Sequence, residues 1–208
     1  MRREIHVPGR GVLHGRMRGF SMLEVLITLV ILAFGLLGLI NLQIKLQMNE
    51  VESYQRGQAL MLLNDMAARL QAHPLNPDTM SGDLERLQDY LTGNSWVGVD
   101  GLDCATDFVQ AAADCAAWDE LLEGAAVEQS GGTSGGAMAG ARGCVTQVQA
   151  ADLGFGVCRP PIYRVSVSWQ GLYESATPAV DCAANQYGDE GYRRTVSTLV
   201  VVGSPRCL

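Results

Sequence analysis

The stretch from Gly19 to Ile40, GFSMLEVLITLVILAFGLLGLI, decides how the rest of the chain is to be interpreted. From Phe20 onward it has 21 residues, and its only polar members are Ser21, Glu24 and Thr28. About 20 apolar residues are needed to cross the hydrocarbon core of a membrane as an α-helix. The stretch therefore predicts a membrane-spanning helix over residues 20–40.

The residues before this helix form a basic leader. Residues 1–19 hold five arginines and a single acid, Glu4. A basic flank stays on the cytoplasmic side, so we expect the rest of the chain on the other side of the membrane. An ordinary signal peptide would be cut at a small-x-small site after its apolar run, but here that region reads NLQIKLQM. The small residue at a plausible cut is Gly19, and cleavage there keeps the helix on the mature protein. Met1 and Met17 both remain open as the true start.

Glu24 is the unusual residue of the apolar helix. A carboxylate in a membrane span is costly, and such residues are usually paired or functional. Cleavage after Gly19 creates a new α-amine on Phe20 and makes Glu24 the fifth residue of the mature chain. Because an unpaired charge is costly in a low-dielectric helix bundle, pairing of this carboxylate with the amine of its own or a neighbouring chain would favour one assembly register.

The segment Gly19–Leu39 resembles the class III signal and N-terminal helix of type IV pilins and pseudopilins. The resemblance implies that a prepilin peptidase cuts after Gly19 and methylates Phe20, and that Glu24 directs assembly. It also implies a pilin fold and a life first in the bacterial inner membrane, with the head in the periplasm, and then in a pilus at the cell surface. The sequence departs from major pilins in one respect, since Gly35 and Gly38 stand where those proteins usually carry a helix proline.

Within this family, the continuation GLLGLINLQ at 35–43 and the cysteine-bearing head are most similar to PilV-type minor pilins. The partners implied are other minor and major pilins, the prepilin peptidase and the inner-membrane assembly platform. The expected function is structural: incorporation into a type IV pilus, where the chain helps to initiate or modify assembly. A minor pseudopilin of type II secretion and a membrane-tethered periplasmic binding domain are the alternatives.

Beyond the span, the pattern predicts an α+β head on a long helix. Residues 41–72 place apolar side chains at helical spacing, and Pro74 after His73 should end this amphipathic half, 41–73. Shorter helices are expected around 84–91 and 111–122, and the glycine-rich stretch 130–143 is expected to be a flexible loop. Ile162–Trp169 and Thr195–Val202 have strand composition, and Cys144–Val148 is a weaker third strand. A small antiparallel sheet would then pack on the helix within the head, residues 74–208.

All six cysteines lie in the head, which suggests disulfides in an oxidising compartment. They are Cys104, Cys115, Cys144, Cys158, Cys182 and Cys207. Six cysteines allow 15 pairings, and the sequence does not choose among them. Nearest-neighbour pairing would join 104 to 115, 144 to 158 and 182 to 207, the last of these being a recurring arrangement in pilin-like heads.

Charge and residue content argue against several other functions. Without residues 1–19 the chain has 10 basic and 21 acidic residues, which disfavours nucleic-acid binding, including a role in DNA uptake. The only histidine outside the leader is His73, so no histidine-rich metal site is expected, and a catalytic triad would have to be built on that residue. We therefore expect no enzymatic activity and no cofactor. The three tryptophans are expected to be core or interface residues.

Overall fold

The structure is a computed structural model, and it describes residues 19, 21–73, 80–104, 106–124, 128–129, 133–134, 138–152 and 159–203. The chain divides into two compact units, residues 1–46 and 47–208. The described part of the first unit is the beginning of helix α1, Met22–Gln71, which continues into the second unit. The long helix predicted over 21–72 is confirmed to within one residue at each end.

In the second unit, α1 buries one face against the core. The buried side chains recur every three or four residues, the period of a single helix face, and are Gln55, Ala59, Leu63, Met66, Ala67 and Leu70. The apolar residues of this face, from Ala59 onward, join a hydrophobic cluster with side chains from the sheet, such as Val165 and Val167. This packing of a helix on a sheet confirms the predicted α+β, pilin-like class.

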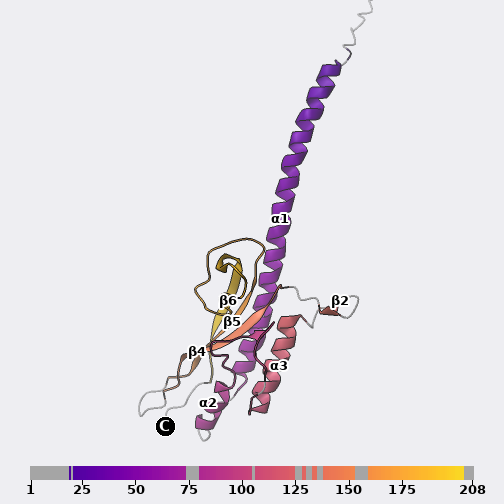
Figure 1. The fold of residues 1–208 in the computed structure, drawn as a ribbon. Helices are drawn as coiled ribbons and strands as arrows, with labels where there is room; N and C mark the ends of the chain where they lie inside the picture. Colours follow the sequence, from indigo (N-terminus) through magenta and orange to yellow (C-terminus); the bar gives the residue numbers. More distant parts are fainter. Residues whose placement is uncertain are drawn as a thin grey trace, which may run out of the picture. The chain divides into compact units, whose positions relative to one another are not determined.

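The main sheet has four strands in the order β1-β4-β5-β6, all antiparallel. They are β1 (Val97–Gly98), β4 (Arg142–Gln149), β5 (Ile162–Gln170) and β6 (Arg193–Val201). Neighbours β4, β5 and β6 lie side by side in Figure 1. All three predicted strands are therefore present. The weakest of them begins at Arg142, two residues earlier than predicted.

Two further helices complete the core. They are α2 (Met80–Gln88), predicted at 84–91, and α3 (Val109–Glu123), predicted at 111–122. Helix α3 ends because Gly124 adopts the left-handed conformation (φ 90°), and its backbone N–H donates to the carbonyls of the helix's last turn. The side chain of Trp118 on α3 is fully buried and donates its indole N–H to the Leu62 carbonyl of α1, at 3.0 Å.

The predicted loop over 130–143 is only partly correct. In its described part, β3 (Thr133–Ser134) pairs with β2 (Glu128–Gln129), and the last two residues of the range belong to β4. Composition misled the prediction at Gly143. A Cβ built on this residue would lie 2.2 Å from the Trp118 ring, so glycine here allows the ring to pack on the strand and does not indicate a flexible chain.

Candidate processing and assembly site

The expected cleavage junction lies at the start of α1. The Ser21 carbonyl accepts the backbone N–H groups of Glu24 (2.9 Å) and Val25 (3.3 Å), which are the first described hydrogen bonds of the helix. Gly19 lies outside the helix and is exposed, and a Cβ built on it would meet nothing within 4 Å. The backbone at Gly19 is therefore accessible, as a protease site requires. Phe20, the predicted methylated residue, lies outside the described residues.

Glu24 lies in the first turn of α1 and is exposed. A carboxylate in this position is favoured by the partial positive charge of the helix N-terminus. Within the described part of the chain it forms no ion pair, so the carboxylate is available to an amine. The other polar side chain on the described helix surface nearby, Thr28, donates its hydroxyl to the Val25 carbonyl at 2.9 Å, which lets it enter an apolar environment.

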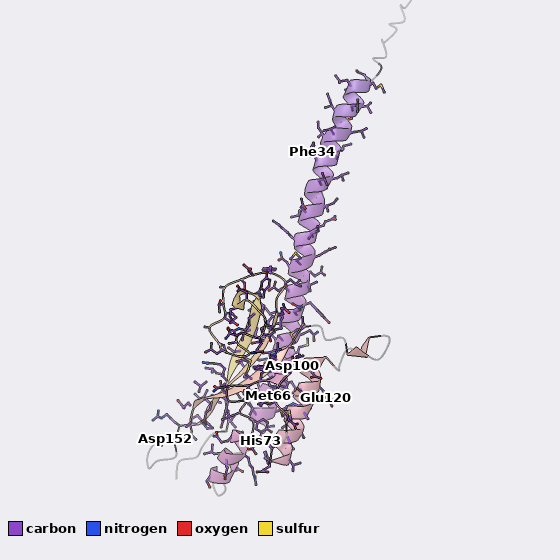
Figure 2. The ribbon with its side chains drawn as sticks, viewed as in Figure 1. Phe34, Met66, His73, Asp100, Glu120 and Asp152 are labelled. Atoms are coloured by element: carbon purple, nitrogen blue, oxygen red, sulfur yellow. A yellow bond between two sulfur atoms is a disulfide. The ribbon has the colours of Figure 1, made fainter. Side chains whose placement is uncertain are left out.

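The surface that follows Glu24 is apolar all round. Every residue from Ser21 to Gln47 is exposed, and the large apolar side chains among them include Phe34, which is 71% exposed. Figure 2 shows these side chains projecting from α1 in all directions, with Phe34 labelled. Among the described helices, α1 alone is long and apolar enough to cross a membrane. Such a surface must be covered by lipid or by other apolar helices.

The head is cross-linked by two disulfides among the described cysteines. Cys104 is joined to Cys115, as nearest-neighbour pairing predicts. Cys144 is joined to Cys182, so the pairings 144–158 and 182–207 are wrong. The reason is spatial: Cys144 on β4 pairs with Ser166 on β5, and the segment around Cys182 crosses this part of the sheet. Cys158 and Cys207 lie outside the described residues.

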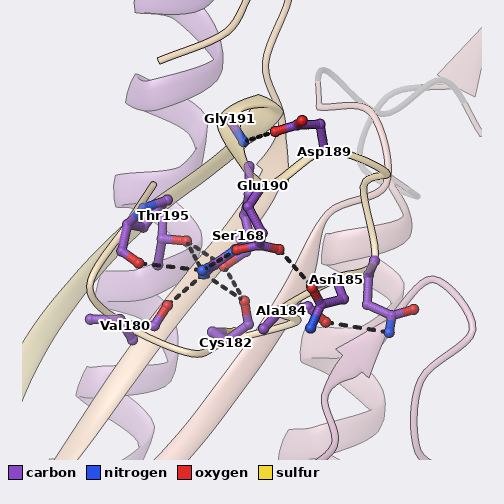
Figure 3. A network of polar contacts seen from close by, with 12 residues as sticks. Ser168, Val180, Cys182, Ala184, Asn185, Asp189, Glu190, Gly191 and Thr195 are labelled. Atoms are coloured by element: carbon purple, nitrogen blue, oxygen red, sulfur yellow. Dashed lines mark hydrogen bonds and ion pairs between the residues drawn. The ribbon is translucent and has the colours of Figure 1, made fainter. Parts of the chain in front are cut away.

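Arg193 holds the same segment in place from the start of β6. Its side chain is 1% exposed and pairs with the Glu190 carboxylate, at 2.6 Å from Nη2 and 2.7 Å from Nε. It also donates to backbone carbonyls, including that of Cys182 at 3.3 Å. Figure 3 shows Ser168, Thr195 and Glu190 in this network. The sequence did not reveal this role, because an arginine that opens a strand carries no signal for burial.

His73 contributes to a polar cluster at the end of α1. Its ring contacts the hydroxyl of Tyr90, and this hydroxyl donates to Asp114 of α3 at 2.6 Å. The other oxygen of Asp114 accepts from Arg69 of α1 at 2.8 Å. Burial lowers the pKa of His73, whereas burial and the hydrogen bond to Asp114 raise the pKa of Tyr90. The cluster joins α1 to α3 through matched donors and acceptors.

Comparison with known proteins identifies the N-terminal segment. Residues 15–40 match the family model of the prokaryotic N-terminal methylation motif. Curated proteins and solved structures give no match to the chain. The matched range contains Gly19, Phe20 and Glu24, and it supports the type IV pilin family. It supports, more particularly, a pilin-like prepilin that is processed by a peptidase, and together with α1 it indicates membrane anchoring.

Proposed function

We propose that this chain is a minor pilin most similar to the PilV type. It is inserted into the bacterial inner membrane with its head in the periplasm, cut after Gly19 and methylated on Phe20. It then enters a type IV pilus and helps to initiate or modify assembly, with no catalytic activity or cofactor of its own. Its partners are other pilins, the prepilin peptidase and the inner-membrane assembly platform.

One observation carries this proposal. The stretch of α1 up to Ile40 is apolar on every side and bears a single exposed acid, Glu24, four residues after the expected new N-terminus. A monomeric periplasmic domain would need the apolar surface only for anchoring, and the acid would then be a pure cost. In a filament the same acid neutralises the amine of a neighbouring chain, and the apolar surfaces cover one another. Both features are then used.

The first test is the chemical nature of the mature N-terminus. The protein is purified from its own membranes and its N-terminal peptide is analysed by mass spectrometry. We expect N-methylphenylalanine at position 20. A mature chain that still begins at Met1 or Met17 would rule out the filament function, because the amine that Glu24 is proposed to neutralise would not exist.

The second test replaces Glu24. Both Glu24→Ala and Glu24→Gln should be processed normally but be incorporated into pili at least about tenfold less, since an uncompensated amine in a low-dielectric bundle costs more than about 1.4 kcal/mol. Glu50→Ala is the matched control, because Glu50 is an exposed acid of α1 beyond the apolar stretch. Incorporation is measured by immunoblotting of sheared pili, and equal amounts for all variants would refute the role of Glu24.

The type II secretion alternative is separated by deleting the gene. Under the minor-pilin proposal, deletion reduces surface pili and leaves the secretion of folded enzymes intact. The reverse result would assign the chain to the secretion system, whose pseudopilins have the same type of N-terminus.

A further inference from the structure

A cavity of about 410 Å³ lies on the face of the sheet that is opposite the hydrophobic core. Its floor includes Thr146 of β4 together with Arg164 and Ser166 of β5. Its sides are formed by residues 93–95 and by the segment 179–182. The size falls in the range of about 300–1,000 Å³ that small-molecule sites occupy. The proposed pilin function uses none of these residues.

The floor of this cavity carries a guanidinium group without a counter-charge. Arg164 is partly buried between its cross-strand neighbours Thr146 and Leu199. It forms no hydrogen bond or ion pair with any described residue. The other arginines of the sheet each pair with a carboxylate, and they are Arg142, Arg193 and Arg194. A planar guanidinium fork that is not engaged elsewhere matches a carboxylate group.

Hydroxyl groups surround this guanidinium. Thr146 lies directly across from Arg164 on β4, and Ser166 is the next residue on the same face of β5. Ser166 is only 2% exposed, and its hydroxyl, which lines the cavity and is not sealed from solvent, has no hydrogen-bond partner within the described chain. Ser95 adds a third hydroxyl from the side. Because hydroxyl groups can donate to a carboxylate, the floor forms an anion-binding surface.

The side of the cavity carries the opposite charge. Asp181 is exposed there, and it forms no ion pair with Arg164 or with any other cation in the part of the chain that the structure describes. An anion alone would add negative charge beside Asp181, and a cation alone would add positive charge beside Arg164. A ligand with both charges is favoured, since each of them then meets its opposite.

We propose that this cavity binds a free α-amino acid. Its carboxylate accepts from the Arg164 guanidinium and from the hydroxyls of Thr146 and Ser166, while its ammonium group donates to Asp181. Within a peptide chain these two charges lie at opposite ends, so a free amino acid satisfies both at one site. The Val180 side chain lines the same cavity and offers an apolar surface to the ligand's side chain.

The test observes the Arg164 guanidinium by NMR. The full mature chain, in an uncharged maltoside detergent, is labelled with ¹⁵N-arginine, and the Arg164 Nε–H signal is assigned with Arg164→Gln. Alanine, valine, leucine and glutamine are titrated singly at neutral pH. We expect at least one to shift the Arg164 signal saturably. The Arg142 and Arg193 signals should stay fixed, because those side chains already pair with carboxylates.

Small molecules that lack part of this chemistry provide the opposing arms. Acetate carries only the carboxylate, ethylammonium only the ammonium group, and phosphoethanolamine a phosphate in place of the carboxylate. Acetate should bind at least about twofold and ethylammonium at least about tenfold more weakly than the best amino acid, since each loses one ion pair. Acetate or phosphoethanolamine that binds as tightly as the best amino acid would overturn the proposal, and so would a signal that moves with no ligand.

Variants assign each charge to its residue. Saturation-transfer NMR observes the ligand, so it measures affinity without the arginine probe. Arg164→Gln should weaken binding at least about tenfold, and Asp181→Asn, at an exposed position that folding does not require, by about two- to fivefold. Arg56→Gln and Glu120→Gln remove exposed charges of the same two kinds outside the cavity and should leave the affinity unchanged. Unchanged affinity in Asp181→Asn, or an equal loss in the control variants, would overturn the assignment.

Discussion

At the scale of single residues, the absence of a side chain at Gly143 leaves room for the Trp118 ring, at which α1, α3 and β4 meet. A Cβ there would lie 2.2 to 2.7 Å from three ring atoms of Trp118. The tryptophan in turn reaches α1 through its bond to the Leu62 carbonyl. Helix α3, strand β4 and α1 therefore meet at one ring, and the glycine is part of that contact.

Gly143→Ala should lower the free energy of unfolding by about 1–3 kcal/mol, because the new methyl group overpacks the Trp118 site. Gly82→Ala is the control. Its Cβ in α2 meets nothing within 4 Å, and alanine stabilises a helix by about 0.5–1 kcal/mol relative to glycine. Denaturant unfolding of both variants, followed by tryptophan fluorescence, measures the two changes. Opposite signs are expected, and a common sign would contradict the packing explanation.

His73 is the only histidine after residue 19, since the other two are His6 and His14. Burial lowers its pKa in the folded state. The unfolded chain therefore binds this proton more tightly, so the stability contributed by neutral His73 is present above about pH 6.5 and is lost as the pH falls below that value. Midpoints of denaturant unfolding between pH 5 and 8 should show this loss, and His73→Gln should remove it.

A second loss of stability at lower pH should survive in His73→Gln. Burial by itself would raise the pKa of Asp114, but hydrogen bonds from Tyr90, Gln110 and Arg69 outweigh it and lower the pKa. This contribution is present above about pH 4 and is lost as the pH falls further. If the variant had the same pH profile as the wild-type protein between pH 5 and 8, the first loss would not come from His73.

At the scale of elements, the connection between β5 and β6 is fixed on the sheet by two devices. The disulfide Cys144–Cys182 joins it to β4, and Arg193 joins it to β6. Ser166 and Ser168, which alternate with the core residues of β5, are consequently buried as well. The Ser168 hydroxyl donates to the Cys182 carbonyl at 3.0 Å, so this polar face is matched by a polar partner.

Peptide mapping tests the pairing without reduction. Trypsin leaves Cys144 and Cys158 in one peptide. A second protease that cuts before aspartate separates them at Asp152, and its cuts before Asp181 and Asp189 isolate Cys182 in a short peptide. We expect the peptide 143–151 linked to 181–188, whereas a link from 152–164 to 143–151 would contradict the structure. By loop length, the Cys144–Cys182 bridge should contribute about 4 kcal/mol and Cys104–Cys115 about 3 kcal/mol. Denaturant unfolding of Cys144→Ser/Cys182→Ser and Cys104→Ser/Cys115→Ser measures both contributions.

At the scale of the whole molecule, the two units differ in how much apolar surface they expose to solvent. The described part of residues 1–46 exposes apolar side chains and buries none, while residues 47–208 contain a hydrophobic core together with 20 acidic and nine basic residues. A unit with its own core can fold by itself. The apolar helix surface needs lipid or a filament, whereas residues 47–208, which are the head together with the second part of α1, need neither.

A shortened chain covering Gln47–Leu208 should therefore be monodisperse in buffer without detergent. The mature chain from Phe20 should require detergent, because its apolar helix would be exposed to water. Size-exclusion chromatography with light scattering compares the two, and circular dichroism checks that the head is folded. Aggregation of the shortened chain with intact secondary structure would show that the head carries an additional apolar surface.

The sequence by itself determined the long helix, the three main strands and the presence of disulfides, and it predicts the cleavage junction after Gly19 and the role of Glu24. These follow from residues close together in the chain, where composition and period carry the information. Only the tertiary structure decided the partner of Cys144, the need for glycine at 143, the burial of Arg193 and the contacts of His73. Each of these depends on residues brought together from distant parts of the chain. Fifteen cysteine pairings fit the same sequence, and packing of the β5–β6 connection on the sheet selects the partner of Cys144.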